Sequence, residues 1–107
     1  MNKETEQKIN QLQLIEQNMQ NILMQKQQFQ TQLIEVESAL KELEKTQKAY
    51  KIVGNIMVSA DKEELLKDLQ GKKETMELRI KTLEKQEEQM KEKASAMQSE
   101  VMEKLKK

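Results

Sequence analysis

Apolar side chains recur along the first half of this chain at alternating steps of three and four residues. The row comprises Leu12, Ile15, Met19, Ile22, Lys26, Phe29, Leu33, Val36, Leu40, Leu43, Gln47 and Tyr50, of which two members are polar. This spacing places the side chains on one face of a helix, at the a and d positions of a heptad repeat. Its persistence over nearly six heptads predicts a long coiled-coil helix over about residues 4–48.

The second half repeats the pattern and predicts another helix over about residues 62–105. Its a and d rows comprise Leu66, Leu69, Lys73, Met76, Ile80, Leu83, Glu87, Met90, Ala94, Met97 and Val101. The polar members of both rows weaken the apolar seam but can fix its register or the choice of partner. Outside the seam, Glu and Lys stand four residues apart in the favourable order, as at Glu100 and Lys104.

Between these helices the pattern changes within KIVGNIMVSAD, residues 51–61. The pair Gly54-Asn55 suits a two-residue β-hairpin turn with positive φ at Gly54, and β-branched residues flank it. The turn pairs Val53 with Ile56 in a hairpin over about residues 50–60, and it places Ile52 opposite Met57. The alternative is a helix that continues or kinks through the segment, which β-branched residues and Gly-Asn disfavour.

Two helices of equal length around a central turn predict a mostly α fold, an antiparallel coiled-coil helical hairpin that forms a single domain over residues 1–107. In this arrangement residue i lies opposite residue 110 minus i, to within a few positions. Asp61 stands three residues before Glu64, the spacing of a capping box, and marks the start of the second helix near Lys62.

Both faces of the expected β-hairpin are largely apolar, and its two outer edges have no strand beside them. A lone two-stranded hairpin is marginal in water, and open strand edges invite pairing with other chains. We therefore expect hairpins from several chains to assemble into a sheet or β-barrel platform. The predicted oligomerisation residues are Tyr50, Ile52, Val53, Gly54, Ile56, Met57 and Val58.

Composition narrows the function. The chain has 107 residues, 19 basic and 19 acidic, and contains no His, Cys, Pro or Trp. Without imidazole or thiol groups we expect no catalytic site, no metal and no cofactor. The charges are intermixed and the aromatics few, so we expect no nucleic-acid partner. Nothing approaches the ~20 apolar residues of a membrane span, and we predict a cytoplasmic protein.

The stretches AYKIVGNIMVSADKEEL and LRIKTLEKQEEQM, together with the helix–hairpin–helix order, resemble the beta subunit of archaeal prefoldin. The resemblance implies a hexamer of two alpha and four beta subunits, whose hairpins build a double β-barrel platform from which six coiled coils project. It also implies an ATP-independent chaperone that holds unfolded client proteins and passes them to a group II chaperonin. Three lysines near the C-terminus could meet an acidic surface of that chaperonin: Lys104, Lys106 and Lys107.

Client binding requires exposed apolar surface, and the helix ends far from the hairpin are the candidates. Unbranched Met is suited to such a surface because it repacks against varied partners. Several of these residues occupy heptad positions, so ordinary seam packing is the alternative interpretation. The candidates are Ile9, Leu12, Ile15, Met97, Val101, Met102 and Leu105.

Two other functions compete with this one. A structural or tethering coiled coil, such as a parallel dimer that spaces two partners, would have no β structure and no chaperone activity. A membrane-surface helix would have a basic face opposite Trp or Phe, and the sequence has neither mark.

Overall fold

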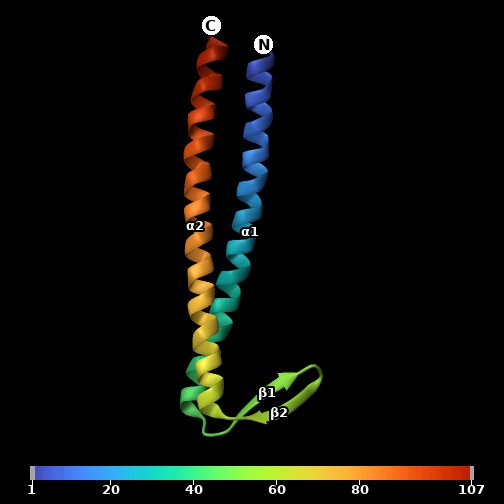
Figure 1. Ribbon diagram of the computed structural model, residues 1–107, viewed down its shortest axis with the longest axis vertical. Coiled ribbons are helices and arrows are strands. Elements are labelled where there is room, and N and C mark those ends of the chain that lie inside the picture. The colour runs from blue at the N-terminus through green and yellow to red at the C-terminus, as the bar shows by residue number, and fades with distance from the viewer. Residues whose placement is uncertain (1, 107) are drawn as a thin grey trace. The chain divides into compact units, whose positions relative to one another are not determined.

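The computed structural model describes residues 2–106 and contains four elements: α1 (Lys3–Lys45), β1 (Ala49–Val53), β2 (Ile56–Ala60) and α2 (Lys62–Lys106) (Figure 1). This order confirms the predicted fold of two long helices around a central antiparallel β-hairpin. It also excludes a helix that runs on through residues 51–61. The hydropathy of the helices gives no candidate membrane span among the described residues.

The chain divides into two compact units. The terminal unit contains residues 2–27 and 81–106 of the described chain, so it holds the start of α1 and the end of α2. The hairpin unit contains residues 28–80, the end of α1, both strands and the start of α2. In the terminal unit α1 and α2 run antiparallel, as ion pairs joining Glu4 to Lys104 and Lys8 to Glu100 demonstrate. These pairs follow the register predicted from the sequence.

The heptad seam predicted from the sequence is the core of each unit. Every a and d residue from Leu12 to Leu43 and from Leu66 to Val101 is buried or half-buried. The most deeply buried apolar side chains of the terminal unit are Ile15, Ile22, Leu83 and Val101, and those of the hairpin unit are Val36, Ala49 and Ile80. Residues three and four apart therefore pack between the helices as knobs, which is the coiled-coil arrangement.

The seam does not continue through Gln47 and Tyr50, which the heptad pattern included. The helix α1 ends at Lys45, before the expected residue 48, and both residues are exposed beyond it. The Thr46 N–H donates to the Leu43 carbonyl at 3.4 Å, which closes the last turn more tightly than an α-helix. Strand pairing then begins at Ala49, opposite Ala60, one pair further from the turn than predicted. The hydrogen-bond ladder between β1 and β2 pairs the backbone N–H and C=O groups that would otherwise have extended α1.

The hairpin has the predicted register, since Val53 pairs with Ile56 and Ile52 with Met57. Gly54 has a φ of 62°, and no non-glycine residue of the described chain has positive φ. Positive φ at the first central position alone is the requirement of a type II′ turn, whose twist matches that of the flanking strands. Gly54 is therefore needed for its backbone conformation.

At the far end of the hairpin, Asp61 caps α2. Its side-chain Oδ1 accepts a hydrogen bond from the Glu63 N–H at 3.2 Å, and its carbonyl accepts from the Leu65 N–H at 3.0 Å. The cap satisfies one of the free donors of the first turn, and α2 begins at Lys62 as predicted.

Candidate functional site

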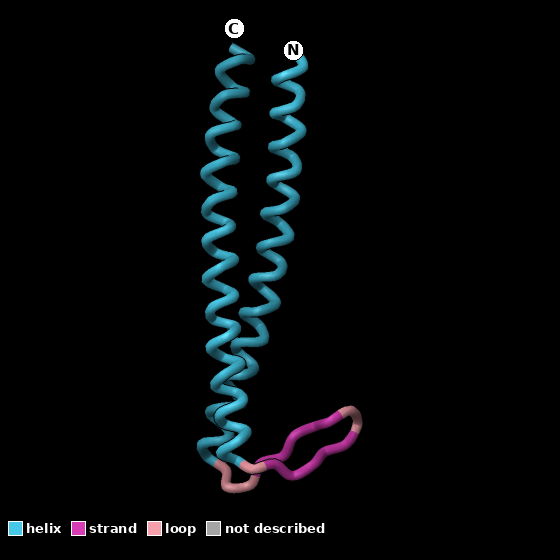
Figure 2. The backbone as a smooth tube through the Cα atoms, in the orientation of Figure 1, coloured by secondary structure: helices cyan, strands magenta, loops and turns pink. Residues whose placement is uncertain are grey.

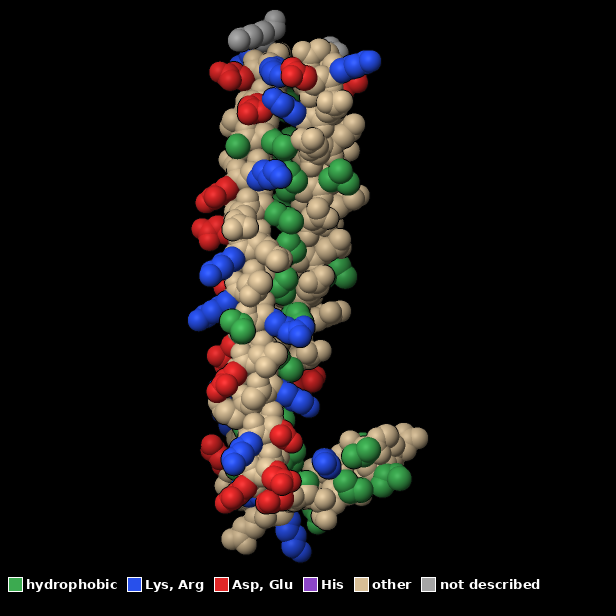
Figure 3. Space-filling model, viewed as in Figure 1, with side chains coloured by type: hydrophobic (Ala, Val, Ile, Leu, Met, Phe, Trp, Pro, Cys, Tyr) green, Lys and Arg blue, Asp and Glu red, His purple; other side chains and the backbone are tan. Residues whose placement is uncertain are grey.

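The hairpin carries most of the large exposed apolar side chains of its unit. Among the predicted oligomerisation residues, Ile52 is 72% exposed and Ile56 and Met57 are each 66% exposed. Tyr50, Val53 and Gly54 are also exposed, and Val58 is half-buried. Figure 3 shows these apolar side chains gathered on the projecting hairpin. Monomeric proteins rarely leave contiguous apolar surface of this kind uncovered, so the hairpin is a candidate interface.

The two faces of the hairpin differ in how much the chain itself covers them. Ala49 is buried, and Val58 and Ala60 on the same face are half-buried. The opposite face presents Tyr50 and Ile52 with their cross-strand partners, all of them exposed. The first face also carries Val53 and Ile56, which are exposed beside the turn, so the chain covers this face only around Ala49, Val58 and Ala60.

The outer edges of the hairpin are open. The sheet of the described residues contains only β1 and β2, so each strand has one side without a neighbour (Figure 2). Proteins usually protect such edges with charges or prolines, but the hairpin strands carry a single charge, on Lys51, and no proline. The edges can thus accept a further strand through main-chain hydrogen bonds.

The second candidate surface is the end of the terminal unit, where seven apolar residues were predicted to contact clients. Met102 is 57% exposed and Leu105 58% exposed. Ile9, Leu12 and Met97 are half-buried. The remaining two, Ile15 and Val101, lie in the seam and are only 9% and 7% exposed. Contact with Ile15 or Val101 would require α1 and α2 to separate, whereas Met102 and Leu105 are accessible as they stand.

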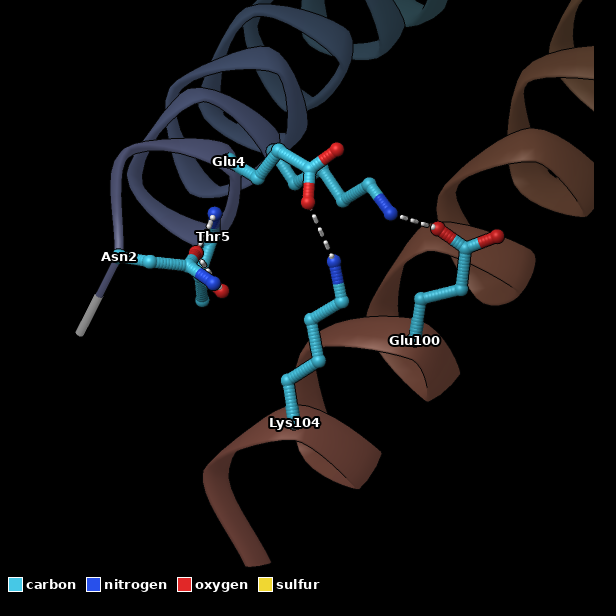
Figure 4. A network of polar contacts seen from close by, with 6 residues as sticks. Asn2, Glu4, Thr5, Glu100 and Lys104 are labelled. Carbon is cyan, nitrogen blue, oxygen red and sulfur yellow. Dashed lines mark hydrogen bonds and ion pairs between the residues drawn. The ribbon is translucent and has the colours of Figure 1, made fainter. Parts of the chain in front are cut away.

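Polar contacts close this end of the terminal unit (Figure 4). The Lys8 ammonium lies 2.6 Å from a Glu100 carboxylate oxygen, and the Lys104 ammonium lies 3.3 Å from Glu4. The predicted pairing of Glu100 with Lys104 along α2 is thus replaced by contacts between the helices. Exposed pairs of this kind are individually weak, but together they hold the two helix ends in one register.

The shorter of these pairs shifts the pKa of both partners. The hydrogen bond from Lys8 lowers the pKa of the Glu100 carboxyl, and the same hydrogen bond raises the pKa of the Lys8 ammonium. Nearby Lys104 lowers the pKa of Glu100 further through its charge. The pair therefore favours the charged form of both groups.

Asn2 caps the start of α1, a contact that the sequence reasoning missed. Its Oδ1 accepts hydrogen bonds from the Thr5 N–H and the Thr5 hydroxyl, both at 2.8 Å. Thr5 is only 3% exposed, although it is polar. The sequence does contain a signal for this cap, because Asn is a preferred N-cap residue and the backbone N–H that it accepts from stands three residues later.

A polar layer also interrupts the seam of the terminal unit. Lys26 on α1 lies 3.5 Å from Glu87 on α2, and both side chains are 17% exposed. Glu87 also lies 3.6 Å from Lys91, one turn further along α2. Because an unpaired charge is costly in such a position, the Lys26–Glu87 pair favours the observed register over shifted ones.

The three lysines that were predicted to meet a chaperonin are placed unequally. Lys104 is engaged by Glu4, and Lys106 is exposed at the end of α2. Lys107 lies outside the described residues. No group of three or more potential metal-ligating His, Cys, Asp or Glu side chains occurs within residues 2–106.

Comparison with known proteins gives one consistent result. The family model described as "Prefoldin subunit" matches residues 6–107. Prefoldin subunit beta of Archaeoglobus fulgidus is 44% identical over 91 residues, which cover 82% of this chain and 78% of that protein. Prefoldin subunit beta of Thermococcus onnurineus is 40% identical over 88 residues, covering 79% of this chain and 76% of the relative.

A solved structure agrees with these sequence matches. The crystal structure of the prefoldin beta subunit from Thermococcus strain KS-1 superimposes with a TM-score of 0.90 and 30% sequence identity. The match covers 99% of this chain and 96% of that chain. The helix–hairpin–helix fold is thus shared over nearly the whole length of both.

Proposed function

Because this chain belongs to the prefoldin family as a beta subunit, we propose that it works in a hetero-oligomeric chaperone that holds unfolded proteins without ATP. The observation that carries the proposal is the exposed hairpin. Its apolar faces and open edges are unsuited to a free subunit and well suited to an assembly. The family is one of chaperones rather than enzymes, and we place the complex in the cytoplasm.

In the proposed assembly, four copies of this chain join two alpha subunits in a hexamer. Each chain contributes its hairpin to a double β-barrel platform, in which strand edges pair with neighbouring hairpins and apolar faces are covered. The residues that would form these contacts are Tyr50, Ile52, Val53, Gly54, Ile56, Met57 and Val58. Closure into a barrel removes free edges, which explains how the hairpin can lack protective charges.

Clients would bind at the end of the terminal unit. Met102 and Leu105 offer accessible apolar contacts, and Ile9, Leu12 and Met97 lie partly exposed beside them. Ile15 and Val101 would join when the helices separate. Each end contributes a weak contact, and several ends on one platform multiply the affinity through effective concentration.

The complex would then pass its client to a group II chaperonin. The basic residues Lys104, Lys106 and Lys107 would meet an acidic chaperonin surface. Replacing all three with Gln should weaken docking to the chaperonin while client holding remains unchanged. Unchanged docking, measured by surface plasmon resonance, would show that the contact lies elsewhere.

A tethering coiled coil without chaperone activity is the competing function. Mixing the chain with a prefoldin alpha subunit and measuring mass by light scattering separates the two. A hexamer that suppresses aggregation of an unfolded protein without ATP supports the chaperone. A particle that ignores the alpha subunit, or a hexamer with no effect on aggregation, supports the tether.

Truncation tests where clients bind. Removing residues 1–12 and 97–107 should leave the hexamer intact, because the hairpin unit is untouched. Protection of the unfolded protein should fall strongly with the deleted ends. Full protection by the truncated hexamer would contradict the assignment of client binding to them.

A further inference from the structure

The two helices of the terminal unit have very different surfaces. Along α1, Glu16 is the only charged residue between positions 9 and 25. Along α2 in the same unit, eight of the thirteen residues from 81 to 93 are charged. In Figure 3 α1 is mostly tan and green below its charged first turns, whereas α2 beside it carries most of the red and blue. The scarcity of charged residues is therefore a property of α1 and not of the terminal unit as a whole.

Amide side chains replace the missing charges. Six residues on the outward b, c and f heptad positions of α1 are exposed and uncharged, and we call them the amide strip: Gln13, Leu14, Gln17, Gln20, Asn21 and Met24. Within it, Leu14 is 58% and Met24 60% exposed. Beside the strip, Met19 and Leu23 line a groove of about 400 Å³ whose other walls carry the charged residues Glu16, Lys26, Glu87 and Lys91.

Solubility alone does not explain this surface, because charged residues give it more effectively and already do so on α2. Each Gln or Asn side chain offers an acceptor oxygen and two N–H donors, the same set that an extended main chain presents. Binding through these groups buries no charge, so it avoids the desolvation that a Lys or Glu surface would require. Exposed Leu and Met supply apolar contacts that adapt to varied side chains.

We propose that the amide strip binds extended segments of unfolded polypeptide, along the side of α1 rather than at its end. The charge distribution favours this occupant, since a neutral surface repels neither acidic nor basic segments. The proposal rests on the holdase function proposed above and adds a second contact area to it. A second copy of this chain is the competing occupant.

Two double variants test the proposal in the assembled hexamer. Gln17→Glu with Asn21→Lys places a charge pair on the strip in the orientation that supports a helix. Gln86→Lys with Gln89→Glu places the same charges on exposed amides of α2 in the same unit. Both leave the net charge unchanged. Their binding is measured against reduced, carboxamidomethylated lysozyme, which is basic and stays unfolded, and against acidic α-lactalbumin treated in the same way.

We expect the α1 variant to bind both unfolded proteins about tenfold more weakly, equivalent to the loss of one or two good contacts. The α2 variant should bind as the unaltered hexamer does. Equal effects of the two variants, or none, would overturn the proposal. If the unaltered hexamer binds neither protein, the holdase function itself fails, which is a separate result.

A photo-crosslinking residue identifies the occupant directly. Benzoylphenylalanine at Gln17 should attach to the unfolded protein, and at Gln89 it should attach far less. Crosslinks from position 17 to another subunit, unaffected by added unfolded protein, would assign the strip to contacts between copies and overturn the proposal.

Discussion

The terminal unit and the hairpin unit contain the same helical seam, but they differ in how much of their apolar surface the chain itself buries. In the terminal unit the seam is covered by the chain itself and closed by ion pairs that join Lys8 to Glu100 and Lys104 to Glu4. In the hairpin unit the seam gives way to strands whose side chains are mostly exposed. One unit covers its apolar seam within the chain itself, and the other leaves most of its strand side chains exposed.

The difference shows that burial is not a property of apolar residues alone. Ile22 and Ile52 are chemically identical, yet the first is 7% exposed and the second 72% exposed. The heptad spacing gives Ile22 a partner helix in the same chain. The hairpin reverses the chain over two residues, and the neighbour that it gives Ile52 is Met57 on the opposite strand.

The strongest test removes the apolar surface of the hairpin. Replacing Ile52, Val53, Ile56 and Met57 with Ser should abolish assembly with the alpha subunit, because apolar area can no longer be buried between chains. Light scattering would report the mass, and circular dichroism should still show most of the helix. A hexamer of normal mass would mean that the hairpin is not the assembly interface.

The next effect concerns the polar layer of the terminal unit. Glu87→Lys replaces the acid between Lys26 and Lys91 with a third cation. It should lower the free energy of unfolding by about 2 kcal/mol. The exchanged pair, Lys26→Glu with Glu87→Lys, should recover most of this loss. Urea unfolding at one fixed protein concentration measures both.

A matched control for that test is Glu88→Lys, on the adjacent exposed position of α2. It makes the same change of charge outside the seam, so its effect should stay within about 0.5 kcal/mol. If Glu88→Lys and Glu87→Lys are equally destabilising, net charge and not the seam contact is responsible.

A smaller effect of opposite sign distinguishes the two glycines of the hairpin unit. Gly71 lies on an exposed face of α2 with no atom within 4 Å of an added Cβ. Gly71→Ala should therefore stabilise the fold by about 1 kcal/mol through helix propensity. Gly54→Ala should destabilise it by about 1 kcal/mol, because alanine disfavours a positive φ. Thermal unfolding of both variants checks the signs; stabilisation by both would contradict the turn assignment.

The smallest effect is the pH dependence of the closed end of the terminal unit. The pKa of Glu100 is lowered from its ordinary value of 4.5, so the stabilisation is present above this value and is lost as pH falls through the folded-state pKa. The pKa of Lys8 is raised from 10.5, so its contribution is present below 10.5 and is lost as pH rises through the folded-state pKa. Carbon chemical shifts of residues 3–8 should report fraying at both extremes.

The variant Lys8→Gln provides the control for this pH dependence. It removes the hydrogen-bond partner that causes the shift, so most of the fraying transition attributed to Glu100 should move back toward pH 4.5. An unchanged profile would show that the pair does not hold the helix ends together.

Much of the fold was predictable because local rules act strongly in this chain. The heptad spacing specified both helices, and Gly54-Asn55 specified the turn and with it the strand register. Asp61 marked the start of α2 for the same reason, since an N-cap satisfies nearby backbone donors. The end of α1 was less certain, because no glycine or proline follows Lys45 and strand pairing decided the boundary.

The surfaces were harder to predict. Heptad position indicated that Ile15 and Val101 face the partner helix, but it did not show whether the chain end is open or closed. Lys104 has Glu100 one turn before it along α2 and Glu4 across from it on α1, so the choice between these two partners depends on the relative rotation of the helices. Only three-dimensional packing settles these choices.

The start of α1 and the end of α2 both belong to the terminal unit, in which the Lys104 ammonium pairs with Glu4. A peptide attached at either of these helix ends would consequently lie at the surface proposed to bind clients and outside the hairpin unit. Affinity tags or fluorophores for single-molecule work would thus disturb capture before they disturb architecture. The same placement offers protein engineers two adjacent attachment points per subunit for grafting new binding specificities onto an unchanged scaffold.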